Sequence, residues 1–440
     1  MKLKFVIKRK NLKYSLNLAM SVLFVLYCFY SYGLQPYFTW KTFYGGIFGF
    51  AGNVPFKSIL ALFIVILSIF WFMKKQPCNK IMIFFAVWLF FTCIIGMFRG
   101  GASRIFSAGW LIYIVSAMFI LSSEDIKSYS YKLLYNIFVI TLIIPIIIYI
   151  IIHIGITVPF MKIEAFEDLK TNYGTYYKIY PLASQWANDY IGSYYDLRLC
   201  GIYNEPGVVG TYTALLLCIE EYKLKGNWKN KILFIGGILS FSLAFYFLTI
   251  AFFIGKLIHL KRKNIFIFII IIISYIVFIN INISNPDIAN IQSRLKITSI
   301  GLEGDNRTNV QYNKIINEFL ENKNITSLLF GNGDMAMNTI QTEKSIDGSS
   351  YKELIYNFGF LGFMSQILWL ILFIFIIRNN NKHIDKKFLI ILLFVYLLNL
   401  YQRPSMFALQ YLIIFVGGIY YKIEKNICND KIYNKKITII

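Results

Sequence analysis

Charged side chains are scarce in this sequence of 440 residues. Only 15% of the residues are charged and 57% are hydrophobic, whereas about a quarter of a soluble globular chain is charged. This composition excludes a water-soluble globular enzyme. The apolar stretches are instead about 20 residues long, which is enough for a helix to cross a lipid bilayer.

The motifs of metal-dependent and nucleotide-dependent chemistry are also absent. The sequence has three histidines and six cysteines, with no Cys-x-x-Cys pair, no phosphate-binding Gly-x-x-x-x-Gly-Lys-Ser/Thr loop and no Asp-x-Asp pair. We therefore expect no disulfide framework, no metal and no cofactor. Any group transfer would have to draw its energy from the substrate itself.

Apolar stretches recur along the whole chain, and residues 1–440 are interpreted as a single integral membrane domain. The fold class that they predict is an all-α, polytopic transmembrane helix bundle of about 11–12 spans with two large external loops. The expected spans lie near residues 14–33, 56–73, 81–98, 105–121, 133–157, 205–220, 265–283, 354–377, 388–401 and 405–421, with one further apolar segment at 232–258.

The apolar segment at residues 232–258 has lysines on both sides, an arginine among those that follow it, and a polar Ser240-Phe241-Ser242 near its middle. Basic flanks favour the cytoplasmic side of a membrane. The segment is therefore expected to enter and leave on the same side as a helix hairpin, with a single tilted span as the alternative. Counting the hairpin as two passes places both termini in the cytoplasm.

The formal net charge of +22 is an orientation signal in this topology. About +21 of it falls on cytoplasmic segments, as the positive-inside rule requires, so the basic charge does not indicate a nucleic-acid partner. Most lysines lie inside, but most arginines lie outside. Because a guanidinium binds phosphate or carboxylate through two hydrogen bonds, the outer arginines indicate an anionic ligand. They are Arg99, Arg104, Arg198, Arg294, Arg307 and Arg403.

Two external loops are long, at about residues 159–204 and 284–353, and loops of this length commonly carry function. The first is rich in tyrosine, which suits membrane anchoring or contact with sugars. The second contains an amphipathic stretch, Thr308 to Lys323, that is expected to form a helix on the membrane or on the bundle.

Two arginines stand directly before helices that run inward from the outer face. Arg198 leads through Glu205 and Pro206 into the span near 205, and Arg403-Pro404-Ser405 leads into the last span. Proline is tolerated best in the first helical turn, and the free N–H groups of a helix N-terminus attract anions. Each arginine and helix end together suit a phosphate or pyrophosphate group. Pairing of Arg198 with Asp196 or Glu205 is the structural alternative.

The order of these motifs resembles the O-antigen polymerase family. The motifs are Arg198-Leu-Cys-Gly-Ile-Tyr-Asn-Glu-Pro206, then Arg294 and Arg307, then Leu329-Phe-Gly-Asn-Gly333, then Gly359-Phe-Leu-Gly362. The resemblance implies a metal-independent glycosyltransferase of lipopolysaccharide or capsule biosynthesis in the cytoplasmic (inner) membrane of a bacterium. Its substrates would be oligosaccharide repeat units carried by undecaprenyl pyrophosphate, joined at the outer face. Membrane lipids and a chain-length regulator are the other expected partners.

The resemblance also implies roles for individual residues. Arg198 and Arg403 would hold the pyrophosphate and stabilise its charge as it leaves, and Glu205 would act as general base. Substrate-binding roles are expected for Arg294, Arg307, Asp196, Asp347 and Tyr203. The alternatives are an O-antigen ligase, which typically has a histidine before Gly359-x-x-Gly362 that this chain lacks, and a flippase for lipid-linked oligosaccharides.

Overall fold

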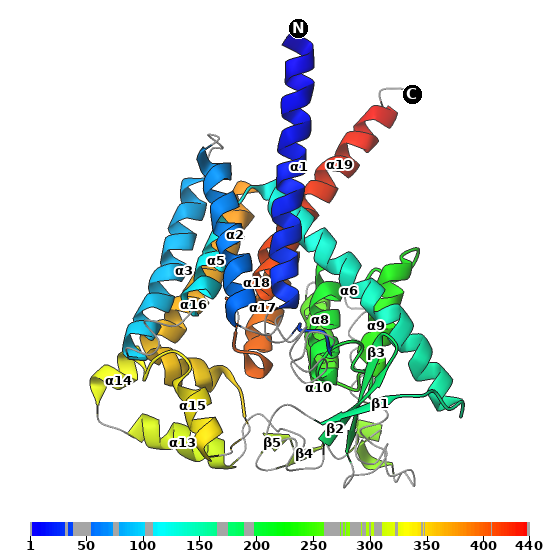
Figure 1. The fold of residues 1–440 in the computed structure, drawn as a ribbon, viewed down its shortest axis with the longest axis vertical. Coiled ribbons are helices and arrows are strands. Elements are labelled where there is room, and N and C mark those ends of the chain that lie inside the picture. The colour runs from blue at the N-terminus through cyan, green and yellow to red at the C-terminus, as the bar shows by residue number, and fades with distance from the viewer. Residues whose placement is uncertain are drawn as a thin grey trace. The chain divides into compact units, whose positions relative to one another are not determined.

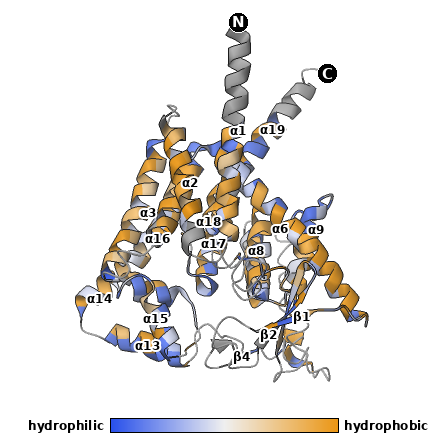
Figure 2. Ribbon diagram, viewed as in Figure 1, coloured by the Kyte–Doolittle hydropathy of each residue, from blue (hydrophilic) through white to orange (hydrophobic). Residues whose placement is uncertain are grey.

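The computed structural model of the chain is mainly helical (Figure 1). It describes residues 2–30, 34–37, 54–73, 79–101, 109–164, 175–188, 198–258, 296–298, 301–302, 310–321, 324–344, 346, 348–405 and 407–437, with a few single positions between 273 and 292. Three described helices are long and apolar enough to cross a membrane, by length and composition: α3 (Lys80–Arg99), α6 (Glu124–His153) and α16 (Tyr351–Asn380). Figure 2 shows hydrophobic residues along much of each of them.

The other predicted spans also fall largely on helices, except for the one near 265–283, which lies mostly outside the described residues. These helices are α1 (Lys2–Phe29), α2 (Val54–Met73), α5 (Gly109–Leu121), α8 (Pro206–Ile219) and α17 (Lys386–Gln402). The last predicted span contains α18 (Leu409–Leu412), a π-helical turn (Ile413–Gly417) and the start of α19 (Gly418–Ile437).

The chain folds into two compact units that are interleaved in sequence. Unit 1 comprises Met1–Phe138, Leu361–Lys386 and Ser405–Ile440, and unit 2 comprises Val139–Phe360 and Lys387–Pro404. Each unit combines segments that lie far apart along the chain.

Unit 1 packs aromatic side chains between its helices. Trp369 of α16 is fully buried and donates a hydrogen bond from its indole N–H to the carbonyl oxygen of Phe85 in α3, at 2.9 Å. The same indole stacks on Phe373, with ring centroids 5.4 Å apart. A buried indole that finds a hydrogen-bond partner contributes both apolar area and a fixed orientation. These contacts join α3 to α16.

Unit 2 contains an antiparallel sheet that the sequence analysis did not anticipate. Its strands are β1 (Met161–Glu164), β2 (Thr175–Tyr180) and β3 (Ala183–Asn188), in the order β1-β2-β3. Tyr177 and Ile179 of β2 are buried, in the alternation expected for a strand with one covered face. At least part of the tyrosine-rich loop is therefore a folded sheet. A second, short pair is formed by β4 (Ile297–Thr298) and β5 (Gly301–Leu302).

The segment at 232–258 consists of two helices, α9 (Trp228–Leu239) and α10 (Leu243–Ile258). They separate at the Ser240-Phe241-Ser242 sequence, where the hydroxyl of Ser240 donates to the carbonyl oxygen of Gly237 at 2.7 Å. Phe241 has a φ of 44°, a left-handed conformation that ends the helix. Both helices pack against α8.

The amphipathic stretch at 308–323 forms helix α13 (Val310–Glu321), which confirms the predicted helix. Its apolar face packs with α15 (Ala336–Lys344) and the start of α16. Figure 2 shows hydrophilic as well as hydrophobic residues on α13 and α15. The buried cluster consists of Tyr312, Ile315, Ile316, Phe319, Met337, Ile346 and Tyr356.

Two glycines lie back to back where α14 (Ile325–Phe330) ends and α16 is interrupted. Gly331 and Gly359 have φ values of 75° and 70°, and a Cβ on either would lie 2.2 Å from a carbonyl oxygen, that of Asn357 or Leu329 respectively. The amide of Gly333 donates to the Asn357 carbonyl oxygen at 2.9 Å. The Leu-Phe-Gly-Asn-Gly turn is therefore fixed to α16, and Gly359 divides that 30-residue helix into two pieces.

Candidate functional site

The segment before α8 forms hydrogen bonds with three other elements. Leu199 donates its amide hydrogen to the carbonyl oxygen of Leu239 at the end of α9, at 2.9 Å. Ser184 of β3 donates its hydroxyl to the carbonyl oxygen of Tyr203 at 2.9 Å. The Tyr203 hydroxyl lies 2.9 Å from that of Thr141 in α6. These contacts determine where the side chains of residues 198–205 lie.

Arg198 is a buried arginine, with 7% of its surface exposed. Its Nε donates to the carbonyl oxygen of Ser240 at 3.3 Å, at the C-terminal end of α9. A cation is stabilised there by the partial negative charge of the helix terminus. Arg198 also lines a narrow pocket together with Tyr149, Tyr180 and Gln185. The guanidinium thus has a firm structural anchor in unit 2.

Glu205 and Arg403 form an ion pair between residues 198 positions apart in the chain. Their side chains are only 17% and 15% exposed. Glu205 precedes α8, with Pro206 as its first residue, as predicted. Arg403 follows α17, and its amide donates to the carbonyl oxygen of Asn399 at 2.8 Å. The two residues are therefore in contact, but Arg403 does not stand directly before a helix as predicted, because the next described helix, α18, begins at Leu409.

The first turns of α8 lie beside both arginines. A Cβ on Gly207 would lie 3.3 Å from Nη2 of Arg403. A Cβ on Gly210 would lie 2.3 Å from the Cβ of Ser242 and 3.0 Å from the hydroxyl oxygen of Ser240, whose carbonyl oxygen binds Arg198. Each glycine permits a close approach that a larger residue would block. Arg403 thus lies near Gly207. The turn whose carbonyl oxygen binds Arg198 lies near Gly210, three residues further along α8.

Tyr203 is fully buried in this arrangement, and its hydroxyl is engaged with α6. Burial raises the pKa of this hydroxyl well above its usual range, so it stays neutral at physiological pH. Tyr203 therefore positions the segment that carries Arg198 and Glu205. The other predicted site residues lie outside the described residues: Arg294, Arg307, Asp196 and Asp347.

Two polar residues at this site were missed by the sequence analysis. Ser240 supplies the carbonyl oxygen for Arg198, and Asn399 supplies the one that receives the amide of Arg403. Asn399 carried a usable signal, because a polar amide within an otherwise apolar helix is costly in a membrane and is commonly functional. Ser240 carried none, since a backbone carbonyl contact leaves no pattern in the sequence.

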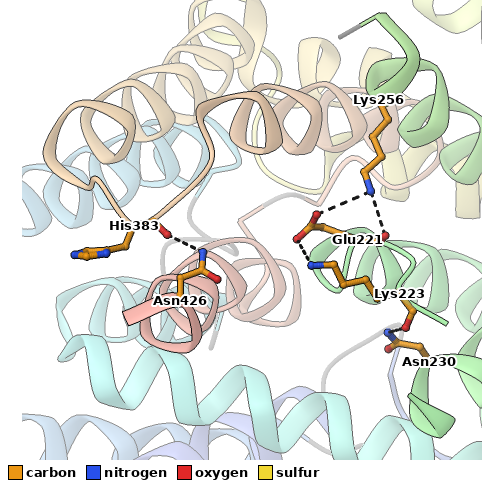
Figure 3. A network of polar contacts seen from close by, with 6 residues as sticks. All are labelled: Glu221, Lys223, Asn230, Lys256, His383 and Asn426. Carbon is orange, nitrogen blue, oxygen red and sulfur yellow. Dashed lines mark hydrogen bonds and ion pairs between the residues drawn. The ribbon is translucent and has the colours of Figure 1, made fainter. Parts of the chain in front are cut away.

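A second polar network in unit 2 lies just beyond the C-terminal end of α8 (Figure 3). The carboxylate of Glu221 lies 3.2 Å from Nζ of Lys223 and 3.9 Å from Nζ of Lys256. Nζ of Lys256 also donates to the carbonyl oxygen of Glu221 at 3.3 Å, and Asn230 donates to that of Lys223 at 2.8 Å. Figure 3 also draws a hydrogen bond in unit 1, from Asn426 to the carbonyl oxygen of His383.

Among the residues that the structure describes, no group of three or more His, Cys, Asp or Glu side chains could hold a metal ion. The chain matches no family model, no curated protein and no solved structure.

Proposed function

We propose that this protein is a polymerase that joins undecaprenyl-pyrophosphate-linked oligosaccharide repeat units, of O-antigen or capsule, at the outer face of the bacterial cytoplasmic membrane. The observation that carries the proposal is the partly buried Glu205–Arg403 pair before the N-terminus of α8, in the same unit as Arg198, which is held at Ser240. A carboxylate base and two cations beside one helix terminus supply what this transfer needs.

In the proposed reaction, a hydroxyl oxygen of one repeat unit attacks the anomeric carbon of the sugar on the second. The bond between that carbon and the pyrophosphate oxygen breaks, and the pyrophosphate leaves with the electron pair. Arg198 and Arg403 stabilise its negative charge, and Glu205 accepts the hydroxyl proton. The chemistry uses no metal and no cofactor, because the donor already carries a good leaving group.

Because Glu205 and Arg403 are paired, they can act one after the other in the proposed reaction. A pyrophosphate that binds Arg403 competes with Glu205 for the same guanidinium, because both are anionic acceptors. Donor binding thus releases the carboxylate next to the incoming hydroxyl. The base therefore becomes available only when a leaving group is in place.

Deletion of the gene, followed by gel analysis of the surface glycan, tests the proposal in cells. Loss of a polymerase leaves cores that bear a single repeat unit. Bare cores would instead indicate a ligase, and intermediates trapped inside the membrane would indicate a flippase. Purified protein supplied with lipid-linked repeat units should also form longer chains and release undecaprenyl pyrophosphate without any other protein.

A further inference from the structure

Helix α6 carries a stripe of exposed apolar side chains that continues past the end of the helix. The stripe follows the helical spacing of three and four residues, as expected for a helix surface that lipid covers. It consists of Ile140, Ile144, Ile147, Ile150, Ile154 and Ile156. The sequence has no Lys, Arg, Asp or Glu between Lys132 and Lys162, so Lys162, in β1, is the first charged side chain after this helix.

The turn between β2 and β3 lies beside the last two turns of α6. Phe160, just before β1, reaches the same place, because its ring centroid lies 5.7 Å from that of Tyr180. Figure 2 shows that α6 is hydrophobic up to this end. This end of the sheet therefore lies beside the apolar part of α6. The two elements line one narrow pocket, with Ile148, Tyr149 and Ile152 from α6 and Tyr180, Ala183 and Ser184 from the strands.

The side chains at this end of the sheet are apolar and exposed. Leu182, the second of the two turn residues, is 53% exposed and has a φ of 59°, a conformation for which turns normally use glycine or asparagine. Phe160 and Met161 are 48% and 47% exposed, and Met161 pairs with Ile179 near the end of β2. These three side chains, Phe160, Met161 and Leu182, form the apolar tip of the sheet. A leucine here costs stability through its backbone and through its contact with water, and lipid would remove the second cost.

Two lysines lie next to the apolar tip. Lys162 of β1 and Lys178 of β2 are directly opposite each other, an arrangement in which like charges destabilise a sheet. Nζ of Lys178 lies 5.6 Å from the ring centroid of Phe160, so the lysines share a face with the tip. At about 3.4 Å per residue, Lys162 lies up to about 7 Å beyond Phe160 along the strand. The headgroup layer of a bilayer is about as thick, roughly 5–7 Å on each side.

We propose that this end of the sheet is a membrane-binding surface: the apolar tip enters the edge of the hydrocarbon layer, and Lys162 and Lys178 bind the phosphates of anionic lipids. Apolar side chains flanked by lysines are the chemistry of interfacial membrane binding, and bound phosphates offset the repulsion between the two ammonium groups. The inference concerns lipid contact alone and does not depend on the proposed transfer reaction.

The surface differs from the tyrosine anchoring that the sequence suggested, because Tyr177 and Tyr180 are buried. It also has a consequence for the candidate site. Ser184 follows Leu182 by two residues and donates its hydroxyl to the carbonyl oxygen of Tyr203. Lipid contact at the tip would therefore fix the depth of the segment that carries Arg198.

The test uses the full-length protein in nanodiscs that contain equal parts of phosphatidylglycerol and phosphatidylcholine. Cys78→Ser and Cys428→Ser leave only the four buried cysteines, and Leu182→Cys then takes a bimane label. Lipids with a nitroxide near the top of the acyl chain quench bimane on contact. The label at position 182 should lose most of its fluorescence. A label on Glu343→Cys, an exposed polar position in α15, should keep nearly all of it.

Placing the nitroxide on only one lipid class tests the lysines. Labelled phosphatidylglycerol should quench the bimane at position 182 about fivefold more effectively than labelled phosphatidylcholine. The double variant Lys162→Gln/Lys178→Gln should lose this preference, and it should fold normally because it removes a like-charge pair. Lys225→Gln/Lys231→Gln, which changes two exposed lysines elsewhere in the same unit, is the matched control and should retain the preference.

If Leu182→Cys does not fold, Phe160→Cys carries the same label at the apolar tip. The inference is overturned if the label at the tip is quenched no more than the one on Glu343→Cys, since the tip would then face water or another protein. It is also overturned if both lipid classes quench equally in the protein that retains both lysines, or if the preference survives in Lys162→Gln/Lys178→Gln.

Discussion

Helix α8 has an ion pair at each end, and the two pairs differ in burial and in the origin of their partners. Beyond the C-terminal end, Lys223 is 66% exposed and lies two residues from Glu221. Before the N-terminal end, Glu205 and Arg403 are each less than one-fifth exposed and come from distant parts of the chain. An exposed pair between near neighbours is screened by water, whereas removal of one member of a buried pair leaves an isolated charge.

The residues that surround the two ion pairs also differ. Beyond the C-terminal end, Nζ of Lys256 donates to a backbone carbonyl, which is how cations commonly close helices. At the N-terminal end, a Cβ on Gly207 would lie 3.3 Å from Nη2 of Arg403, and Arg198 donates to the carbonyl oxygen of Ser240. The two ends of α8 thus differ in burial and in the distance along the chain between the paired residues.

The sharpest test of this contrast compares Arg403→Ala with Lys256→Ala. Loss of Arg403 removes the guanidinium that is proposed to stabilise the leaving pyrophosphate and that pairs with Glu205, so chain extension should fall about 100-fold or more. Arg403→Lys keeps the positive charge but loses the planar guanidinium, so its rate of chain extension should lie between those of Arg403→Ala and the wild type. Lys256→Ala should change the rate less than about twofold. Product length from purified lipid-linked repeat units measures all three.

Equal rates for Arg403→Ala and the wild type, with both proteins reaching the membrane, would contradict the proposal that Arg403 binds the pyrophosphate. The two ends of α8 would then not differ in function.

The glycines near the two ends of α8 should differ in stability cost. In Gly210→Ala, the new Cβ would lie 2.3 Å from that of Ser242, so the turn must move, at a cost of about 1–3 kcal/mol. Gly226 has a φ of 74° and open space around it, so Gly226→Ala should cost only the conformational strain, about 1 kcal/mol. Thermal unfolding in detergent measures both, and a larger loss for Gly226→Ala would contradict the close packing at Gly210.

Gly207→Ala should affect catalysis more than folding. The new Cβ would lie 3.3 Å from Nη2 of Arg403, so the guanidinium must shift by a few tenths of an ångström. Such a displacement should lower kcat about tenfold, since catalysis depends steeply on position. Stability should hardly change, because alanine suits a helix better than glycine does. An unaltered kcat would show that the position of Arg403 is not critical.

The smallest effect is expected for Lys223→Ala. Its pair with Glu221 is exposed, so the free energy of unfolding should change by less than about 0.5 kcal/mol, and this change should become smaller still when salt is added. Unfolding at low and high salt checks this. A loss comparable to that of Gly210→Ala would mean that the two ends of α8 are held by similar forces.

Most helices of this chain could be predicted because hydropathy and periodicity are local properties. The amphipathic helix α13 and the break at Ser240 both follow from patterns within a dozen residues. The sheet was missed because its tyrosines suggested membrane anchoring, although alternation along β2 was a usable signal.

The candidate site was predictable only in part. Arg198, Glu205 and Arg403 stood out by residue type and by position before helices, but their partners did not. Arg198 was expected to bind an anionic ligand, with a nearby acid as the structural alternative, and its contact with a carbonyl oxygen 42 positions away was not anticipated. The contact of Glu205 with Arg403 arises from packing between distant segments, which no local pattern encodes.

The interruption at Gly359 also determines how much of α16 matches a bilayer. An unbroken 30-residue helix would be about 45 Å long, well beyond the hydrocarbon thickness of about 30 Å. The piece after the break, residues 360–380, is about 31 Å long at 1.5 Å per residue. The piece after the break is therefore close in length to the hydrocarbon thickness, and the break falls within two residues of the point in the sequence where the chain passes from one unit to the other.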